Sequence, residues 1–181
     1  MRTYRHFHGA LLVGLVALAA GCGTLEYNAA QKATKDGSAL RALGLSPEQV
    51  RYQGTCLAGV KRGTKYPTVQ CIYVQTADQV NFMTYNSEKQ AFEPAARFPI
   101  SEFEKVALGK AINTRQVQLT HQGVTLAFYI AGVEFINSRL TEEIYGSLVA
   151  AGIRQVEPKE WYDISVNTPT TTMVIPVYVG R

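Results

Sequence analysis

The sequence contains few of the residues that build nucleophilic sites. Beyond residue 21 it has a single histidine, His121, and it lacks the Gly-x-Ser-x-Gly segment that presents a nucleophilic serine in many hydrolases. Two carboxylate pairs are present, Glu102 with Glu104 and Glu142 with Glu143, but both occupy segments that we expect to be solvated. The sequence therefore predicts no catalytic residue and favours a binding or scaffold role over an enzyme.

A hydrophobic run long enough to cross a membrane is also missing. The main apolar run covers the eleven residues Ala10 to Ala20, whereas a spanning helix needs about 20. Arg2 and Arg5 precede this run and small residues follow it, which is the layout of an export signal. We therefore predict that residues 1–21 are a signal peptide.

The end of this segment carries a second signal. Ala19-Ala20-Gly21-Cys22 resembles the lipobox of bacterial lipoproteins, although that family usually has leucine where this chain has Ala19. The resemblance implies cleavage before Cys22, a diacylglycerol thioether on its sulfur, and an acyl chain such as palmitate on the new amino terminus. Several acyl chains suffice for stable anchoring in a lipid bilayer. Simple secretion and a retained signal anchor are the alternatives.

The residue after the cysteine bears on the location. It is Gly23, whereas an aspartate there retains lipoproteins in the inner membrane of enteric bacteria. The resemblance therefore implies the periplasmic face of the outer membrane. Without Arg2 and Arg5 the mature chain has 16 basic and 14 acidic residues, a net charge of +2, which does not indicate a nucleic-acid partner.

The mature chain is long enough for one domain on a tether. We expect a lipidated, partly helical tether over residues 22–47, with the helical part near Ser38 to Leu43, and a single β-rich domain over residues 48–181. Residues 152–181 form a C-terminal extension of that domain. A tether of about 25 residues would keep the domain within about 80 Å of the membrane.

The two remaining cysteines are expected to form a disulfide. Cys56 and Cys71 flank a turn candidate, and with Gly63 and Thr64 at its centre they lie opposite each other across an antiparallel hairpin. Export would bring them to an oxidising compartment, where such a bridge stabilises the fold by about 3 kcal/mol. With both cysteines oxidised, one histidine leaves no zinc site, and we expect no metal and no cofactor.

Strand patterns dominate from Val50 to Ile130. Residues 69–76 and 79–85 are expected to be strands, and Phe98 to Leu108 is expected to be one bent edge element because it contains Pro99. The clearest hairpin joins residues 115–121 and 124–130 around Gln122-Gly123. Its expected cross-strand pairs are Val117 with Phe128 and Leu119 with Leu126.

A helical period follows at Asn137-Ser138, a possible cap. Leu140, Ile144, Leu148 and Ala151 fall on one stripe, Glu142 and Glu143 are expected in the first turn, and Gly152 ends the helix. The chain closes with an expected edge strand, Met173 to Val179, which contains Pro176.

This order of elements, with the segment ISEFEKVALGK leading into a hairpin, resembles the pleckstrin-homology and GRAM domains between Val50 and Gly152. The resemblance implies an α+β fold in which a strongly bent antiparallel sheet, or partial barrel, is capped by one C-terminal amphipathic helix. It also implies lipid-headgroup binding at the first hairpin loop, here Lys61, Arg62 and Lys65, although export excludes the usual phosphoinositide ligands. Solvated charges on a hairpin tip are the alternative.

The C-terminal extension is the candidate for a protein partner. An exposed edge strand offers unpaired backbone groups to a neighbouring protein, unless the strand completes the domain's own sheet. The residues that we nominate for this contact are Trp161, Tyr162, Val174 and Val177. The sequence thus predicts a lipid-anchored binding or scaffold protein of the cell envelope, with a headgroup- or glycan-binding module and an envelope hydrolase as alternatives.

Overall fold

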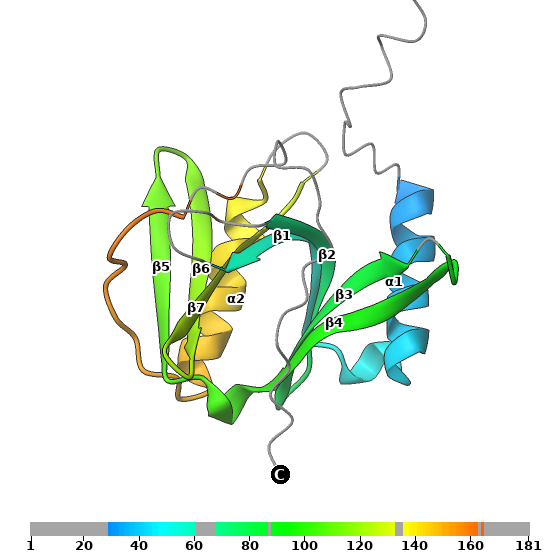
Figure 1. The fold of residues 1–181 in the computed structure, drawn as a ribbon, viewed down its shortest axis with the longest axis horizontal. Helices are drawn as coiled ribbons and strands as arrows, with labels where there is room; N and C mark the ends of the chain where they lie inside the picture. Colours follow the sequence, from blue (N-terminus) through cyan, green and yellow to red (C-terminus); the bar gives the residue numbers. More distant parts are fainter. Residues whose placement is uncertain (1–28, 61–67, 87, 133–135, 163, 165–181) are drawn as a thin grey trace, which may run out of the picture.

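A computed structural model describes residues 29–60, 68–86, 88–132, 136–162 and 164, except for the side chains of residues 29–34. Seven strands form one antiparallel sheet in the order β4-β3-β2-β1-β7-β6-β5, which is strongly bent and does not close on itself (Figure 1). The predicted fold class, β-rich α+β with one helix after the last described strand, is confirmed. The strands are β1 (Tyr52–Val60), β2 (Thr68–Gln75), β3 (Gln79–Asn86), β4 (Ala91–Pro99), β5 (Lys105–Ala111), β6 (Thr114–His121) and β7 (Val124–Ile130).

The main core lies on the inner face of the sheet, which is the face that packs against the helix α2 (Ser138–Ala150). Tyr73 stacks on Phe128 with ring centroids 4.9 Å apart, and Phe82 meets both rings edge-on. These three fully buried rings come from β2, β7 and β3, so they join the two halves of the bent sheet. Each aromatic pair contributes about 0.5–1.5 kcal/mol beyond the area that it buries.

The helix α2 begins where the sequence predicts. The Asn137 side chain accepts a hydrogen bond from the Leu140 backbone N–H over 3.1 Å, and Gly152 follows the helix with a φ of +93°. Ile144 and Leu148 are fully buried, as expected from the stripe. Two details differ from the prediction. The residues Glu142 and Glu143 lie beyond the first turn because the helix already begins at Ser138, and Ala151 is exposed at the C-cap.

A second helix, α1 (Ala29–Leu43), covers part of the opposite, outer face of the sheet. The predicted helical part of the tether, Ser38 to Leu43, is therefore only its last turns. Ala39 and Leu40 pack against a patch on β2 and β3, and Gly44 at φ +68° ends the helix in a Schellman motif closed by the Leu45 N–H on the Leu40 carbonyl. The patch consists of Ile72, Val74 and Met83.

The prediction of a single edge element between Phe98 and Leu108 is wrong. The segment contains the end of β4, a short 3-10 helix η3 (Ile100–Glu102) and the start of β5. β4 and β5 are the two end strands of the sheet, so η3 carries the chain from one edge to the other. The prediction missed β4 because Pro94 and Pro99 interrupt its pattern, yet an end strand tolerates proline on its unpaired side.

Both predicted hairpin registers are confirmed. Cys56 lies opposite Cys71 in the β1–β2 pair, and Val117 and Leu119 lie opposite Phe128 and Leu126 in the β6–β7 pair. In the part of the chain that the structure describes, neither helix is long and apolar enough to cross a bilayer. The expected strand Met173 to Val179 falls outside the described residues.

Candidate functional site

The two cysteines of the first hairpin form the predicted disulfide. Cys56 on β1 and Cys71 on β2 have Cα atoms 5.1 Å apart, and both side chains are buried in the main core. The bridge thus closes the hairpin from inside the domain, where solvent does not reach it. The basic residues of its loop, Lys61, Arg62 and Lys65, and the lipidation candidate Cys22 fall outside the described residues.

The chain after α2 turns back along the sheet. The Val106 N–H on β5 donates to the Arg154 carbonyl, and the Val156 N–H donates to the Val106 carbonyl, both over 2.9 Å. Val106 and Gln155 therefore form a short parallel bridge on the outer edge of β5. We refer to residues 153–162, together with Ile164, as the C-terminal strap.

Two buried glutamines on β6 hold this strap against the outer face. The Gln116 side chain donates to the Tyr162 carbonyl over 2.8 Å and accepts from the Tyr162 N–H over 3.2 Å. Gln118 donates to the Glu160 carbonyl over 2.8 Å and to the Gln116 side-chain oxygen over 3.1 Å. The glutamines thus hydrogen-bond the backbone of the strap from the outer face of β6, as strand-like pairing would.

Apolar contacts complete the attachment. Trp161 lies against Gly109 on β5. A Cβ atom added to that glycine would be only 3.5 Å from the Cε3 atom of the Trp161 ring. Tyr162 is buried in a cluster with residues of β1 and β7, and the Tyr129 hydroxyl donates to the Ile164 carbonyl over 2.9 Å. The cluster contains Leu57, Ala127, Tyr129, Tyr162 and Ile164.

These contacts change the assignment of the nominated partner residues. Tyr162 is occupied by the chain's own sheet and is not presented to another protein, while Trp161 is partly buried. Val174 and Val177 fall outside the described residues. Sequence reasoning missed Gln116 and Gln118 because alternation places them opposite the core residues Val117 and Leu119, on a face expected to meet solvent.

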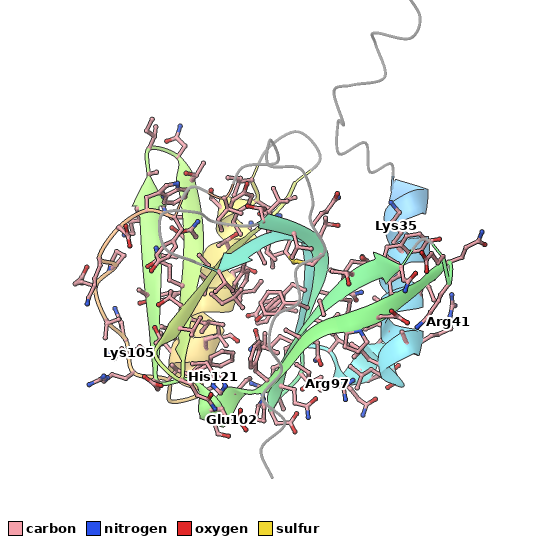
Figure 2. The ribbon with its side chains drawn as sticks, in the orientation of Figure 1. Lys35, Arg41, Arg97, Glu102, Lys105 and His121 are labelled. Carbon is pink, nitrogen blue, oxygen red and sulfur yellow. A yellow bond between two sulfur atoms is a disulfide. The ribbon has the colours of Figure 1, made fainter. Side chains whose placement is uncertain are left out.

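The lone described histidine lies at a structural corner. The His121 ring lies 5.2 Å from the Phe98 ring and 6.2 Å from the Phe103 ring, and its Nδ1 is 3.1 Å from the Glu102 carbonyl oxygen (Figure 2). The Glu104 carboxylate accepts from the Gly123 N–H over 3.2 Å. His121 and the Glu102–Glu104 pair thus brace the β6–β7 turn against the segment that follows β4.

The second carboxylate pair on α2 makes ion pairs. Glu142 contacts the Arg115 guanidinium over 2.5 Å and Glu143 contacts Arg139 over 2.9 Å. The Arg139–Glu143 pair is exposed and contributes little to stability, whereas the Arg115 side chain in the other pair is only 24% exposed. Among the described residues, no group of three or more histidine, cysteine or acidic side chains could hold a metal ion.

One polar network lies inside the core. The fully buried Tyr73 hydroxyl donates to the Gln75 side-chain oxygen over 2.8 Å, and the Gln75 amide donates to the Ser147 hydroxyl on α2 over 2.6 Å. Burial raises the pKa of Tyr73 well above its usual value of 10.0, with a smaller contribution from Tyr52. Each of the three side chains in this network, Tyr73, Gln75 and Ser147, therefore has a hydrogen-bond partner, as a buried network requires.

The likenesses of this chain to known proteins lie in its fold and not in its sequence. No protein-family model matches the sequence, and no curated protein matches it. Among solved structures, the hSac2 domain of human phosphoinositide phosphatase Sac2 aligns over 91% of this chain and 98% of its own, at 11% identity and a TM-score of 0.46.

Two further solved structures cover about half of this chain. The Slm1 PH domain in complex with phosphoserine aligns over 56% of this chain and 94% of its own, at 14% identity and a TM-score of 0.39. An inhibited Vav1 structure aligns over 56% of this chain at 9% identity and a TM-score of 0.44, and the chain spans about a quarter, 26%, of that protein's length. The element order expected of a PH-like domain, seven antiparallel strands followed by one helix, is the order found from β1 to α2.

Proposed function

We propose that this chain is an exported lipoprotein, anchored through Cys22 at the periplasmic face of the outer membrane, that acts as a non-enzymatic binding or scaffold domain. Its partner would be another protein of the cell envelope. The lipobox sequence would direct the chain to the membrane, and the folded domain would provide the surface that binds the partner.

The observation that carries this proposal is the buried Cys56–Cys71 disulfide. Protein disulfides form and persist in oxidising compartments and are rare in a reducing cytosol. Because both sulfur atoms lie in the core, the bridge belongs to the folded domain and not to a reactive surface pair. A domain built around a disulfide agrees with a chain that begins with an export signal.

Because the chain's own helices and strap cover faces of the sheet, we assign partner binding to the residues that follow the strap. Helix α2 covers the inner face, and α1 and the strap cover parts of the outer face. Tyr129 holds Ile164, and the 17 residues that follow include the apolar run Met173 to Val179. An apolar segment that follows a firmly held strap in the sequence can add a strand to the sheet of another protein.

The anchor is tested by the intact mass of the protein extracted from envelopes. We expect the mass of residues 22–181 plus a diacylglycerol and an acyl chain, and we expect Cys22→Ser to lose both the lipid and the processing before residue 22. Unmodified protein, or cleavage at another position, would overturn the proposal.

The partner role is tested by crosslinking in intact envelopes. A chain that ends after Ile164 keeps the lipidation sequence and every described residue, so it is a matched control for the full chain. A defined crosslinked partner recovered with the full chain and lost with the shortened chain is expected. Equal recovery with both chains would contradict a role for the last 17 residues.

A second candidate is headgroup or glycan binding by the first hairpin. In the sequence, Lys61, Arg62 and Lys65 follow β1 and precede β2, whose ladder extends to Gly59 opposite Thr68. Three cations on such a connection would attract phosphate or acidic sugar groups. Replacing all three by glutamate should abolish retention of the protein on envelope lipids or glycans, and unchanged retention would exclude this candidate.

A further inference from the structure

The tip of the β5–β6 hairpin presents an unusual side chain. Ile112 is 96% exposed, which makes it the most exposed large hydrophobic residue in the described part of the chain. Its backbone has a φ of +46°, in the left-handed region that favours glycine or asparagine and is strained for a β-branched residue. Strain of this kind, combined with full exposure of an apolar side chain, indicates a constraint other than stability.

The tip is held rigidly by its neighbours. The Ser138 hydroxyl at the start of α2 donates to the Asn113 carbonyl over 2.7 Å. The Arg115 guanidinium donates to the Thr114 carbonyl over 3.0 Å and is itself paired with Glu142. The turn therefore holds its conformation through α2, and the Ile112 side chain points outward from a fixed base.

The position of the tip relates it to the anchor. In Figure 1 the β5–β6 turn and the first residues of α1 lie at the same end of the molecule, at the top of the view. The chain that leads back to Cys22 enters α1 at that end. The β6–β7 turn lies at the opposite end, where Figure 2 labels His121.

We propose that the β5–β6 tip inserts Ile112 into the interfacial region of the bilayer that carries the lipid anchor, and thereby orients the domain on the membrane. This inference rests on the lipid anchor of the proposed function. Lys110, which is exposed two residues before Ile112, is placed to meet the phosphate groups of the bilayer surface. One apolar side chain is too weak to recruit a protein, but it suffices to orient one that is already anchored.

The test measures the depth of single sites on the reconstituted lipoprotein. The parent chain has three cysteines, and with Cys22 lipidated and Cys56 bonded to Cys71 an introduced fourth cysteine is the only free thiol. A fluorophore attached to the cysteine of Asn113→Cys lies beside Ile112, and the Ile112 side chain is unchanged. Val124→Cys, at a 51% exposed position at the start of β7 beside the β6–β7 turn, is the matched control at the far end.

The protein is incorporated into vesicles of phosphatidylethanolamine and phosphatidylglycerol that contain a quencher in their acyl chains. We expect strong quenching at residue 113 and little at residue 124. Adding Ile112→Asn to Asn113→Cys should lower the ratio of inserted to free tips by about tenfold, because the apolar contact is lost. The substitution should not destabilise the domain, because asparagine tolerates a positive φ.

Four other outcomes would overturn the inference. If the protein floats with the vesicles but residue 113 is not quenched, or Ile112→Asn changes nothing, the tip does not insert while the anchor stands. Stronger quenching at residue 124 would favour the basic first hairpin instead, because the β1 end that leads into it pairs with β7 at Val60–Leu126. If the protein does not float and its mass shows an unmodified Cys22, the anchor fails as well.

Discussion

Gln116 and Tyr162 bind each other through two hydrogen bonds although 46 residues separate them in the chain. The Gln116 side-chain amide both donates to and accepts from the Tyr162 backbone, as a residue on a neighbouring strand would. Both residues are buried, so water does not compete for these bonds. This pair fixes the strap on the outer face of β6.

Gln116→Leu should release the strap. The substitution removes both hydrogen bonds between the Gln116 side chain and the buried Tyr162 backbone, although the Tyr162 carbonyl keeps its bond from the Ile164 N–H. Losing buried hydrogen bonds of this kind costs about 1–3 kcal/mol. We expect faster tryptic cleavage after Lys159 and a red shift in the emission of Trp161, the only tryptophan. Gln70→Leu, at an exposed position on β2, is the control and should change neither. An unchanged cleavage rate in Gln116→Leu would contradict the clamp.

Removal of the disulfide should lower the free energy of unfolding by about 3 kcal/mol, because the bridge restricts the unfolded chain between residues 15 apart. The variant is Cys56→Ala with Cys71→Val, measured by chemical unfolding. A reducing agent should destabilise the parent protein by a similar amount and leave the variant unchanged. Equal sensitivity of both proteins to the reducing agent would refute the assignment.

Tyr73 should make the domain less stable at alkaline pH. In the unfolded chain this tyrosine ionises near its usual pKa of 10.0, whereas burial raises the pKa in the folded state. The unfolded state therefore binds fewer protons above that pH, and the free energy of unfolding falls as the pH rises.

Tyr73→Phe tests this assignment. It should flatten the alkaline slope and, near neutral pH, cost about 1–3 kcal/mol because the buried Gln75 oxygen loses its donor. Part of the slope should remain, because burial and Glu157 also raise the pKa of Tyr145. An identical slope in Tyr73→Phe and the parent would show that Tyr73 is not the group responsible.

Gly109→Ala should loosen the strap without removing any of its hydrogen-bonding groups. The new Cβ atom would lie 2.9 Å from the Gln118 Nε2 atom, so that amide must move away from the Glu160 carbonyl. We expect a red shift of Trp161 emission and a lower melting temperature. Gly146→Ala on α2, where a Cβ atom meets nothing within 4 Å, should stabilise the domain by about 0.5–1 kcal/mol. The stability of the domain should fall in Gly109→Ala and rise in Gly146→Ala, and a change in the same direction in both variants would contradict the prediction.

Short-range patterns predicted the parts of the fold that short-range physics determines. The Gln122-Gly123 turn and the cysteine register follow from alternation and turn chemistry, and both are confirmed. The outer face was not predictable in the same way. Whether Gln116 meets solvent or a buried backbone depends on where residues 153–162 return, and no local pattern encodes that contact. The docking of α1 likewise depends on a patch that forms only when β2 and β3 pair.

The docking of α1 also changes the geometry expected at the membrane. A segment of about 25 flexible residues would let the domain sample a wide hemisphere, whereas only six residues separate Cys22 from the start of α1 at Ala29. These can extend by about 25 Å at most. With Cys22 lipidated as proposed, the domain is confined to a thin layer and diffuses in two dimensions. Its effective concentration toward partners embedded in the same membrane is then raised, while proteins on the far side of the periplasm are out of reach.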